Sequence, residues 1–185
     1  MEPDGMLGLF KQTGEDLFRQ GLTTTHGGNL SVRNKQKIAI TAHFAMLGRL
    51  KPGDVVEVPL DEPEDRIAGH ASSDTPLHQL IYRSTSALAV IHAHGAPATA
   101  LSLSEDVIAP TDVEGAVFLR QVPVVAPDQA REMLPRLLKT HACVMVRGHG
   151  SYTAGRSLGE ALAFTSALDF SSRVSLLRIN PGQRW

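Results

Sequence analysis

The sequence has one cysteine, few aromatic residues and no uninterrupted apolar run long enough to cross a bilayer. Cys143 is the only cysteine among 185 residues, which excludes an internal disulfide. It lies in the apolar run ACVMV, where a small buried core residue is more common than a reactive thiol. A spanning helix needs about 18 or more apolar residues, and no run approaches that length. We therefore expect neither disulfide cross-links nor a membrane-spanning helix.

The sequence also lacks an excess of charge of either sign. The chain carries 18 basic and 19 acidic residues, for a formal net charge of −1, and both signs are mixed along it. No basic stripe predicts nucleic-acid binding, and no polybasic cluster predicts attachment to an anionic membrane. The first residues, MEPDGMLGLF, lack the basic and apolar regions of a signal peptide. These features predict a soluble, cytoplasmic protein.

The length and the patterning favour one domain spanning residues 1–185. Hydrophobic residues make up 42% of the chain, enough for a core, and helical and strand patterns alternate without repeats or linkers. Such an order is typical of an α/β domain in which helices cover a central sheet. Hairpin-like connections predict that this sheet is mixed or largely antiparallel.

The expected elements follow from periodicity and turn residues. Helices are predicted near 6–18, 72–83, just after Pro97, over 127–139, where Pro135 should kink or shorten the helix, and over 157–179. Strands are predicted over 37–41, 54–58, 87–94 and 116–125, and on both sides of a tight turn within 142–155. The segment THGGNLSV is predicted to form a glycine-rich turn, and 59–69 a solvated loop.

Two histidines stand one residue apart in the apolar segment VIHAHGAPATAL. Side chains alternate along a strand, so His92 and His94 project to the same side, with Cα atoms about 6.5–7 Å apart. Two imidazoles at that spacing can converge on one metal ion. A third ligand must come from elsewhere in the chain.

His149, in VRGHGSY, is the best candidate for that third ligand. It ends a second apolar strand, and its glycine neighbours allow the backbone to turn tightly. Three histidines with an open fourth position are typical of a catalytic zinc site. The residues alone leave a plain alternative open, in which these histidines are hydrogen-bonded or exposed. His26, His70, His78 and His141 are interpreted as surface or satisfied residues.

Four segments together resemble the class II aldolase/adducin family, which includes fuculose-1-phosphate aldolase and methylthioribulose-1-phosphate dehydratase. They are GLTTTHGGNLSVR, SSDTPLHQLIYR, VIHAHGAPATALS and VMVRGHGSYTAGRSLGEAL, in the family's order and spread over nearly the whole chain. The resemblance implies a three-layer α/β/α domain around the mixed, largely antiparallel sheet. It also implies a divalent metal, usually Zn²⁺ but open to Mn²⁺ or Co²⁺, on His92, His94 and His149, and a homotetramer with sites near subunit interfaces.

Two acids are the candidate proton-transfer residues. Asp74 takes the place of the family's acid, which is commonly a glutamate, and its side chain is shorter by one C–C bond, about 1.5 Å. On the residues alone, an acid at a helix start would favour the macrodipole. Glu114 lies where dehydratase relatives carry a catalytic glutamate and the fuculose-phosphate aldolase type has a tyrosine from a neighbouring subunit. A surface carboxylate is the alternative for Glu114.

The resemblance also implies a substrate-binding pocket. Gly28 and Asn29 belong to its glycine–asparagine loop, and Ser72 and Ser73 supply hydroxyls at a helix start, where anions bind well. The family's threonine–glycine pair is replaced by His43 and Phe44. His43 could donate to an anion, or be simply exposed. A phosphorylated sugar, a carboxylate and a neutral aldehyde all stay open as substrates.

The leading hypothesis is a zinc-dependent class II aldolase, a carbon–carbon lyase acting on a small hydroxy-carbonyl or sugar-phosphate substrate. A metal that binds neighbouring oxygens of a hydroxy-ketone stabilises the enediolate formed when the C–C bond breaks. A dehydratase on the same scaffold is the first alternative, because Glu114 stands where the aldolase tyrosine would be. A non-catalytic interaction module like the adducin head is the second.

Overall fold

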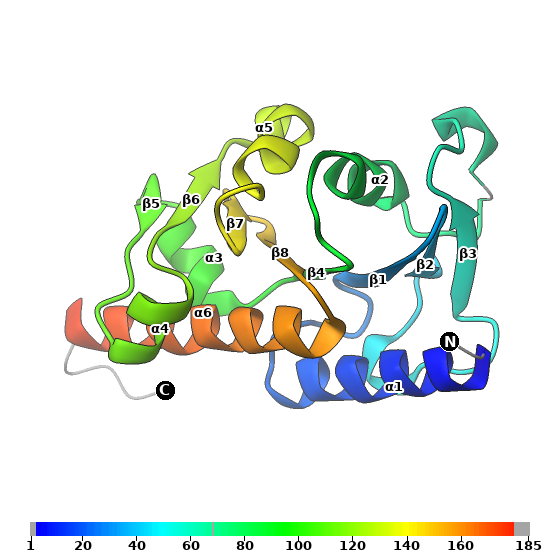
Figure 1. Ribbon diagram of the computed structural model, residues 1–185. Helices are drawn as coiled ribbons and strands as arrows, with labels where there is room; N and C mark the ends of the chain where they lie inside the picture. The colour runs from blue at the N-terminus through cyan, green and yellow to red at the C-terminus, as the bar shows by residue number, and fades with distance from the viewer. Residues whose placement is uncertain (1–2, 68, 180–185) are drawn as a thin grey trace.

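The computed structural model describes residues 3–67 and 69–179, and its centre is one eight-stranded sheet in the order β3-β2-β1-β4-β8-β7-β6-β5 (Figure 1). The strands are β1 Asn29–Asn34, β2 Lys37–Thr41, β3 Val55–Pro59, β4 Ala89–Ala93, β5 Val107–Ile108, β6 Val122–Val125, β7 Cys143–Val146 and β8 Gly150–Gly155. Neighbouring strands are antiparallel except β6 and β7, which are parallel. The mixed, largely antiparallel sheet predicted from the sequence is confirmed.

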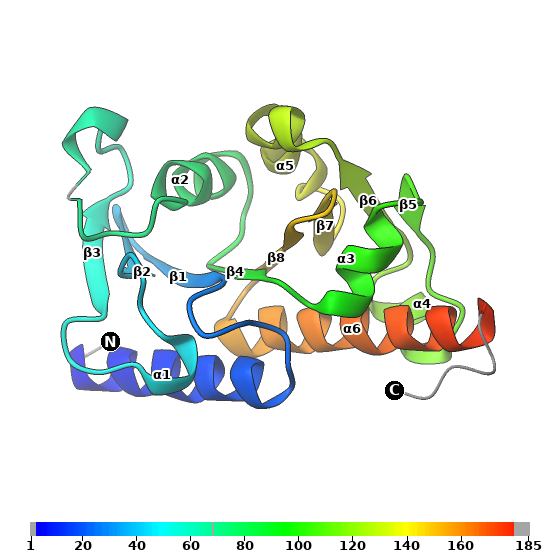
Figure 2. The ribbon, with the colours of Figure 1, turned by 180° about the vertical axis from the view of Figure 1, so that it is seen from behind.

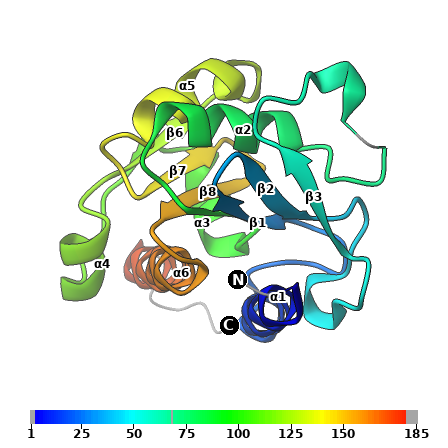
Figure 3. The same cartoon turned by 45° about the vertical axis from the view of Figure 1, so that its right-hand side comes forward.

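Helices cover both faces of the sheet, so the domain has three layers (Figure 3). They are α1 Pro3–Arg19, α2 Thr75–Ser84, α3 Ala96–Ser102, α4 Val113–Phe118, α5 Ala130–Leu137 and α6 Leu158–Ile179, with single 3₁₀ turns at Leu47–Arg49, Glu64–Arg66 and Pro127–Gln129. Helices α2 and α5 lie on one face, and α1 and α6 run along the other (Figure 1). This confirms the α/β/α architecture.

The alternation of side chains along β4 explains why both faces need cover. Val90 packs in the core under α2 and α5, whereas Ala89 and Ile91 pack in the core over α1 and α6. A strand buried on both faces is apolar throughout, which is why residues 87–91 are a continuous apolar run. By the same alternation His92 projects to the side of α2 and α5.

Two predicted elements differ from the structure. Residues 29–32, assigned with 25–28 to a glycine-rich turn, belong to β1, Asn29–Asn34, in the middle of the sheet. Residues 116–118, assigned to a strand, belong to the short helix α4, and only 122–125 pair in the sheet. The strand pattern of AVFLRQVPVV misled because Asp112 caps a helix there, its side chain accepting a hydrogen bond from the Gly115 N–H.

The remaining helix boundaries follow local rules. Pro135 lies inside α5, which is only eight residues long, so the predicted shortening is observed. The Glu160 N–H donates to the Ser157 hydroxyl, as a capping box requires, but the Glu160 carboxylate accepts from the Arg156 N–H instead of Ser157. Across the described residues no helix has both the length and the apolarity for a membrane span.

Candidate metal centre

Three histidines converge where strand β4 ends and the β7–β8 turn begins. The ring centroids of His92, His94 and His149 lie 4.6, 4.8 and 4.9 Å apart in pairs. One nitrogen from each ring can be chosen so that all three lie within 4.8 Å of one another, and the Nε2 atoms of His92 and His94 are 2.8 Å apart. The H-x-H spacing and the hairpin turn therefore bring together the three histidines singled out in the sequence.

Glycines make this convergence sterically possible. A Cβ at Gly150 would overlap the carbonyl oxygen of Ala93 and lie 2.8 Å from Cδ2 of His94 and 3.0 Å from Cε1 of His92. Gly28 has a positive φ of 74°, and a Cβ there would overlap the carbonyl oxygen of His92. Both positions need a residue without a side chain so that loop and turn can approach β4.

Main-chain contacts and burial set the protonation of His92. Its Nδ1 lies 3.0 Å from the carbonyl oxygen of Ser151, which can only accept, so Nδ1 carries the proton and Nε2 keeps a free lone pair. Desolvation lowers the pKa of His92 to about 3 and also lowers the pKa of His94. His92 is therefore a neutral imidazole at pH 7, the form that binds metals.

The three side chains fit a divalent cation. Three imidazole nitrogens within one small volume, with space in the adjoining cavity for a further ligand, are the donor set of catalytic zinc sites. The Ser151 carbonyl supplies the hydrogen bond to the second ring nitrogen that metal-binding histidines usually make. Their burial ranges from the buried His92 through the half-buried His94 to the exposed His149, so the site opens to solvent on one side.

Asp74 lies beside this cluster at the start of helix α2. Its Oδ2 accepts hydrogen bonds from the Asn29 amide at 2.8 Å and the Tyr152 hydroxyl at 2.9 Å, and it lies 3.8 Å from Nε2 of His92. Burial by itself would raise the pKa of this carboxyl. At the low pH where this carboxyl titrates, charge on the His92 and His78 rings and the two donated hydrogen bonds outweigh that effect and hold the pKa below its ordinary value.

A cavity of about 230 Å³ joins these groups. Nine of the ten residues predicted to form the site line it: Gly28, Asn29, His43, Ser72, Ser73, Asp74, His92, His94 and His149. In the described part of the chain the Oδ1 atom of Asn29 is buried without a hydrogen-bond partner. A buried acceptor at a cavity wall costs free energy unless a ligand or water donates to it, so Asn29 is suited to binding a hydroxyl.

The replacement of the threonine–glycine pair has a visible consequence. Phe44 adopts a positive φ of 57° and remains 71% exposed at the cavity, although that conformation costs a bulky residue about 1 kcal/mol or more. Its ring lies 4.1 Å from the His43 ring and 6.0 Å from the His26 ring, measured between centroids. His26, interpreted as an ordinary surface residue, thus belongs to the cavity wall.

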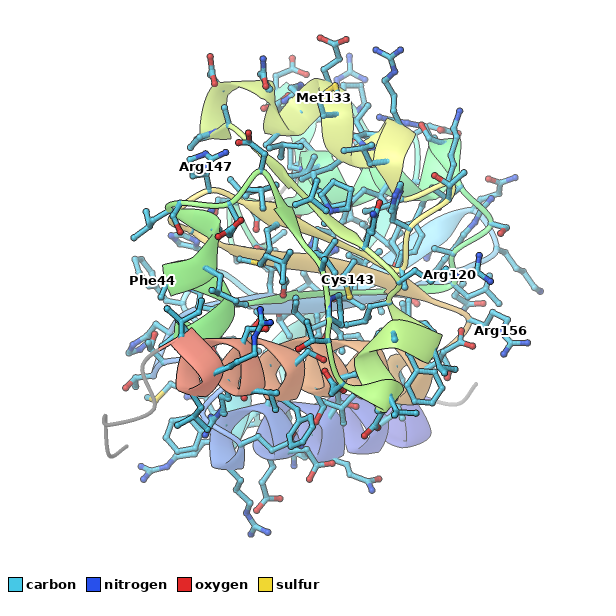
Figure 4. The ribbon with its side chains drawn as sticks, turned by 90° about the vertical axis from the view of Figure 1, so that its left-hand side faces the viewer. Phe44, Arg120, Met133, Cys143, Arg147 and Arg156 are labelled. Atoms are coloured by element: carbon cyan, nitrogen blue, oxygen red, sulfur yellow. The ribbon has the colours of Figure 1, made fainter. Side chains whose placement is uncertain are left out.

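Glu114, the tenth predicted residue, does not reach the cavity of its own chain. It is exposed on α4, which lies in front of α6 in Figure 1. The loop before β1, which carries Gly28 of the cavity lining, and helix α3 come to the front only in the reverse view of Figure 2. Figure 4 places Phe44 and Arg120, two residues beyond α4, on opposite sides of the molecule. Within one chain, Asp74 lines the cavity and Glu114 does not.

The sequence analysis missed Tyr152 and underrated His78. Tyr152 is opposite His92 in the β4–β8 register, a pairing that cannot be read from one strand. His78 is completely buried, and its Nδ1 lies 2.6 Å from the Ser31 hydroxyl, which in turn lies 2.7 Å from the Tyr82 hydroxyl. Burial lowers the pKa of His78 to about 4, so its ring is neutral at pH 7. One signal for His78 is its position four residues after Asp74 on the same helix face.

Comparison with known proteins gives consistent matches. Residues 10–176 match the family model described as Class II Aldolase and Adducin N-terminal domain. The L-fuculose phosphate aldolase of Methanocaldococcus jannaschii is 30% identical, covering 88% of this chain and 91% of that protein. The methylthioribulose-1-phosphate dehydratase of Acidiphilium cryptum is 33% identical, covering 85% and 83%. The crystal structure of L-fuculose-1-phosphate aldolase from Thermus thermophilus superposes with a TM-score of 0.90 at 36% identity, covering 97% of each chain.

Proposed function

Because this chain belongs to the class II aldolase and adducin family, we propose that it is a metal-dependent aldolase acting on a small hydroxy-carbonyl or sugar-phosphate substrate. Relatives of similar identity carry the names of an aldolase and of a dehydratase, both of which are lyases. The observation that carries the proposal is the convergence of three imidazoles and one carboxylate on a single cavity.

His92, His94 and His149 would hold the metal, with Zn²⁺ favoured by three imidazole ligands and Mn²⁺ or Co²⁺ as alternatives. A divalent cation bound there supplies positive charge that lowers the energy of a negatively charged substrate oxygen. The hydrogen bond from His92 Nδ1 to the Ser151 carbonyl fixes the ring so that Nε2 faces the cavity side.

Asp74 is the proposed proton-transfer residue. In the condensation direction its carboxylate accepts the proton from the carbon next to the substrate carbonyl, and the electron pair of that C–H bond moves onto the carbonyl oxygen. The resulting carbon nucleophile forms the new C–C bond with the carbonyl carbon of an aldehyde, and the aldehyde oxygen takes up the proton that Asp74 accepted. Cleavage is the reverse, and Asp74 returns its proton to carbon.

Asn29, Ser72 and Ser73 are the proposed contacts to the far end of the substrate. Ser72 is buried and Ser73 exposed at the turn before α2, and both residues line the cavity together with His43. Hydroxyl and amide groups of this kind bind a phosphate or carboxylate oxygen without a fixed countercharge. His43 would add a further donor.

A dehydratase is the second candidate, and Glu114 favours it. Both reactions begin with proton removal next to the carbonyl, but a dehydratase then needs an acid that protonates a leaving hydroxyl so that water departs. Segment 110–118 contains Glu114 and no tyrosine. Proton exchange beside the carbonyl without any C–C bond formation would favour this candidate.

Glu114 can serve as that acid only in a neighbouring subunit, which connects the reaction to the expected homotetramer. Three exposed apolar residues, Val113, Val117 and Phe118, share α4 with it, and Phe170 is exposed on α6, which α4 contacts. Such a patch is typical of a protein–protein interface. A surface that carries Glu114 into the cavity of a second copy would complete the site. Val117→Asp places a charge in this apolar patch and should therefore weaken the oligomer, which mass photometry measures.

The first experiment measures metal per subunit by mass spectrometry on untagged protein, with His94→Ala and the control His141→Ala, a half-buried histidine that does not line the cavity. We expect close to one divalent metal in the wild type and the control, and loss in His94→Ala. The metal-loaded protein is then incubated with dihydroxyacetone or its phosphate and a panel of short aldehydes. The expected result is condensation that EDTA abolishes.

The outcomes separate the candidates. Metal binding with proton exchange but without condensation would replace the aldolase by the dehydratase. Absence of metal in all three proteins, even after zinc is offered, would contradict both and leave a non-catalytic interaction module as the better interpretation.

A further inference from the structure

Asn29, His92 and Tyr152 form a row across three neighbouring strands. His92 is in register with Asn29 of β1 on one side and with Tyr152 of β8 on the other. Residues in register on adjacent strands project to the same face of a sheet. The metal ligand is therefore flanked on both sides, and both flanking residues donate a hydrogen bond to Oδ2 of Asp74.

Tyr152 makes two contacts that meet at this row. Its ring stacks on the His92 ring with centroids 4.1 Å apart and planes inclined by 11°. Its hydroxyl donates to Oδ2 of Asp74 at 2.9 Å. Tyr152 is only 2% exposed, and because a carboxylate oxygen can only accept, its hydroxyl is the donor in this contact.

The two oxygens of Asp74 consequently have different environments. Oδ2 accepts from Asn29 and Tyr152 and faces His92 at 3.8 Å. Oδ1 accepts no hydrogen bond from the described residues, and Asp74, 24% exposed in its side chain, lines the cavity. One oxygen is occupied by the protein, and the other is left for a proton from the substrate.

We propose that Tyr152 is a positioning residue, which holds Oδ2 of Asp74 so that Oδ1 is presented to the substrate and which keeps the His92 ring in the plane needed for ligation. The inference rests on the proposed function, in which Asp74 transfers the proton. It also assigns a reason for aspartate at position 74. A glutamate would extend about 1.5 Å further and could not keep both donors on the same oxygen with the same backbone.

The test begins with Tyr152→Phe, which keeps the ring and removes the hydroxyl. Losing one hydrogen bond to a charged group should lower kcat about 10- to 100-fold, with KM changed less than about threefold and metal content unchanged. Tyr82→Phe is the matched control, because it also removes a buried hydroxyl, the one that contacts Ser31 outside the cavity. We expect the control to keep its kcat within about twofold.

A double-substitution cycle adds a readout that general destabilisation would not move. Asp74→Glu should lower kcat strongly in the wild type and much less in the Tyr152→Phe background. In that background the clamp, the hydrogen bond by which Tyr152 holds Oδ2 of Asp74, is already absent. Strictly multiplicative effects of the two substitutions would contradict the inference.

Crystal structures of the wild type, Tyr152→Phe and Tyr82→Phe decide the same point without turnover. The Asp74 carboxylate should move or adopt a second rotamer in Tyr152→Phe alone. A carboxylate unmoved in Tyr152→Phe, or kcat unchanged in an active enzyme, overturns the positioning role and leaves the proposed function intact. A wild type without lyase activity overturns the proposed function, while the crystal structures still confirm or refute the clamp.

Discussion

Two cavities lie at opposite ends of strands β4 and β8, and the larger one is not the better candidate site. The cavity beside the N-terminal end of β4 measures about 300 Å³ and is lined by 84–87, Lys139, Arg156 and Glu160, among others. The metal-centre cavity at the other end measures about 230 Å³. Volume alone would select the first.

The difference lies in what the polar groups do. In the larger cavity Arg156 and Glu160 neutralise each other at 2.6 Å, on side chains that are 86% and 23% exposed. In the smaller one, the three imidazoles, the Asp74 carboxylate and the unpartnered amide oxygen of Asn29 belong to residues that line the same cavity. Polar groups that satisfy one another need no ligand, whereas groups brought together without satisfying one another do. The predictions below test this contrast from its largest expected effect to its smallest.

Asp74→Asn should cause the largest loss. General acid–base groups typically contribute about 10²- to 10⁴-fold, so we expect kcat to fall about 10³-fold. The amide is nearly isosteric, and the histidines are untouched, so the metal content should stay near that of the wild type. Steady-state kinetics and metal analysis on the same preparation check both. Residual activity above a tenth of the wild type would remove Asp74 from the mechanism.

Gly150→Ala should disturb the metal centre through sterics alone. The added methyl overlaps the Ala93 carbonyl and crowds both strand histidines, so we expect a loss of about 3 kcal/mol in unfolding free energy and weaker metal binding. Gly159→Ala is the control, because its Cβ would meet only the Ser157 hydroxyl, at 3.8 Å. Denaturant unfolding should find the control as stable as the wild type. Equal effects at the two glycines would contradict the packing argument.

His78→Phe should flatten the acid limb of the stability profile. Burial lowers the folded pKa of His78 to about 4 from an ordinary value of about 6.5, so the unfolded chain binds a proton in this window and the folded one does not. The contribution of His78 to the unfolding free energy is complete above pH 6.5. It is lost as the pH falls toward 4, at about 1.4 kcal/mol per pH unit. Denaturant unfolding of metal-free protein between pH 4 and 7 measures the slope. An unchanged slope in the variant would show that another group titrates there.

Arg156→Ala in the larger cavity should have the smallest effect. Exposed ion pairs contribute little, so kcat and metal content should match the wild type within about twofold, with only a small change in the unfolding midpoint. Kinetics and a thermal melt check this. A large loss of activity would mean that the larger cavity participates in the reaction, and the contrast between the two cavities would fail.

Local patterns predicted most of the fold but not the pairing between strands. Apolar runs and glycine or proline positions located strands such as β4 and β8 and the long helix α6. Strand β1 was missed, because NLSVRN is polar at both ends and its pairing with β4 depends on distant residues. Helix α4 was misassigned because valine and phenylalanine favour strands and only the Asp112 cap favours a helix.

The candidate site divides in the same way. His92 and His94 could be recognised from the period of a strand, and His149 from its flanking glycines. The contact of Asp74 with Tyr152 spans 78 residues of sequence, and its contact with Asn29 spans 45, so neither follows from spacing. That Glu114 does not line the cavity likewise depends on how α4 packs against α6.

The carbonyl of Ser151, which orients His92, is a main-chain group. By strand alternation the Ser151 side chain projects to the face opposite Tyr152 and His92, so its identity is decided by the packing beneath the sheet. The orientation of the His92 ring therefore does not depend on which side chain occupies position 151. An engineer who reshapes the substrate pocket through His43, Phe44 or Ser73 could do so without touching that anchor, since a backbone carbonyl cannot be mutated away.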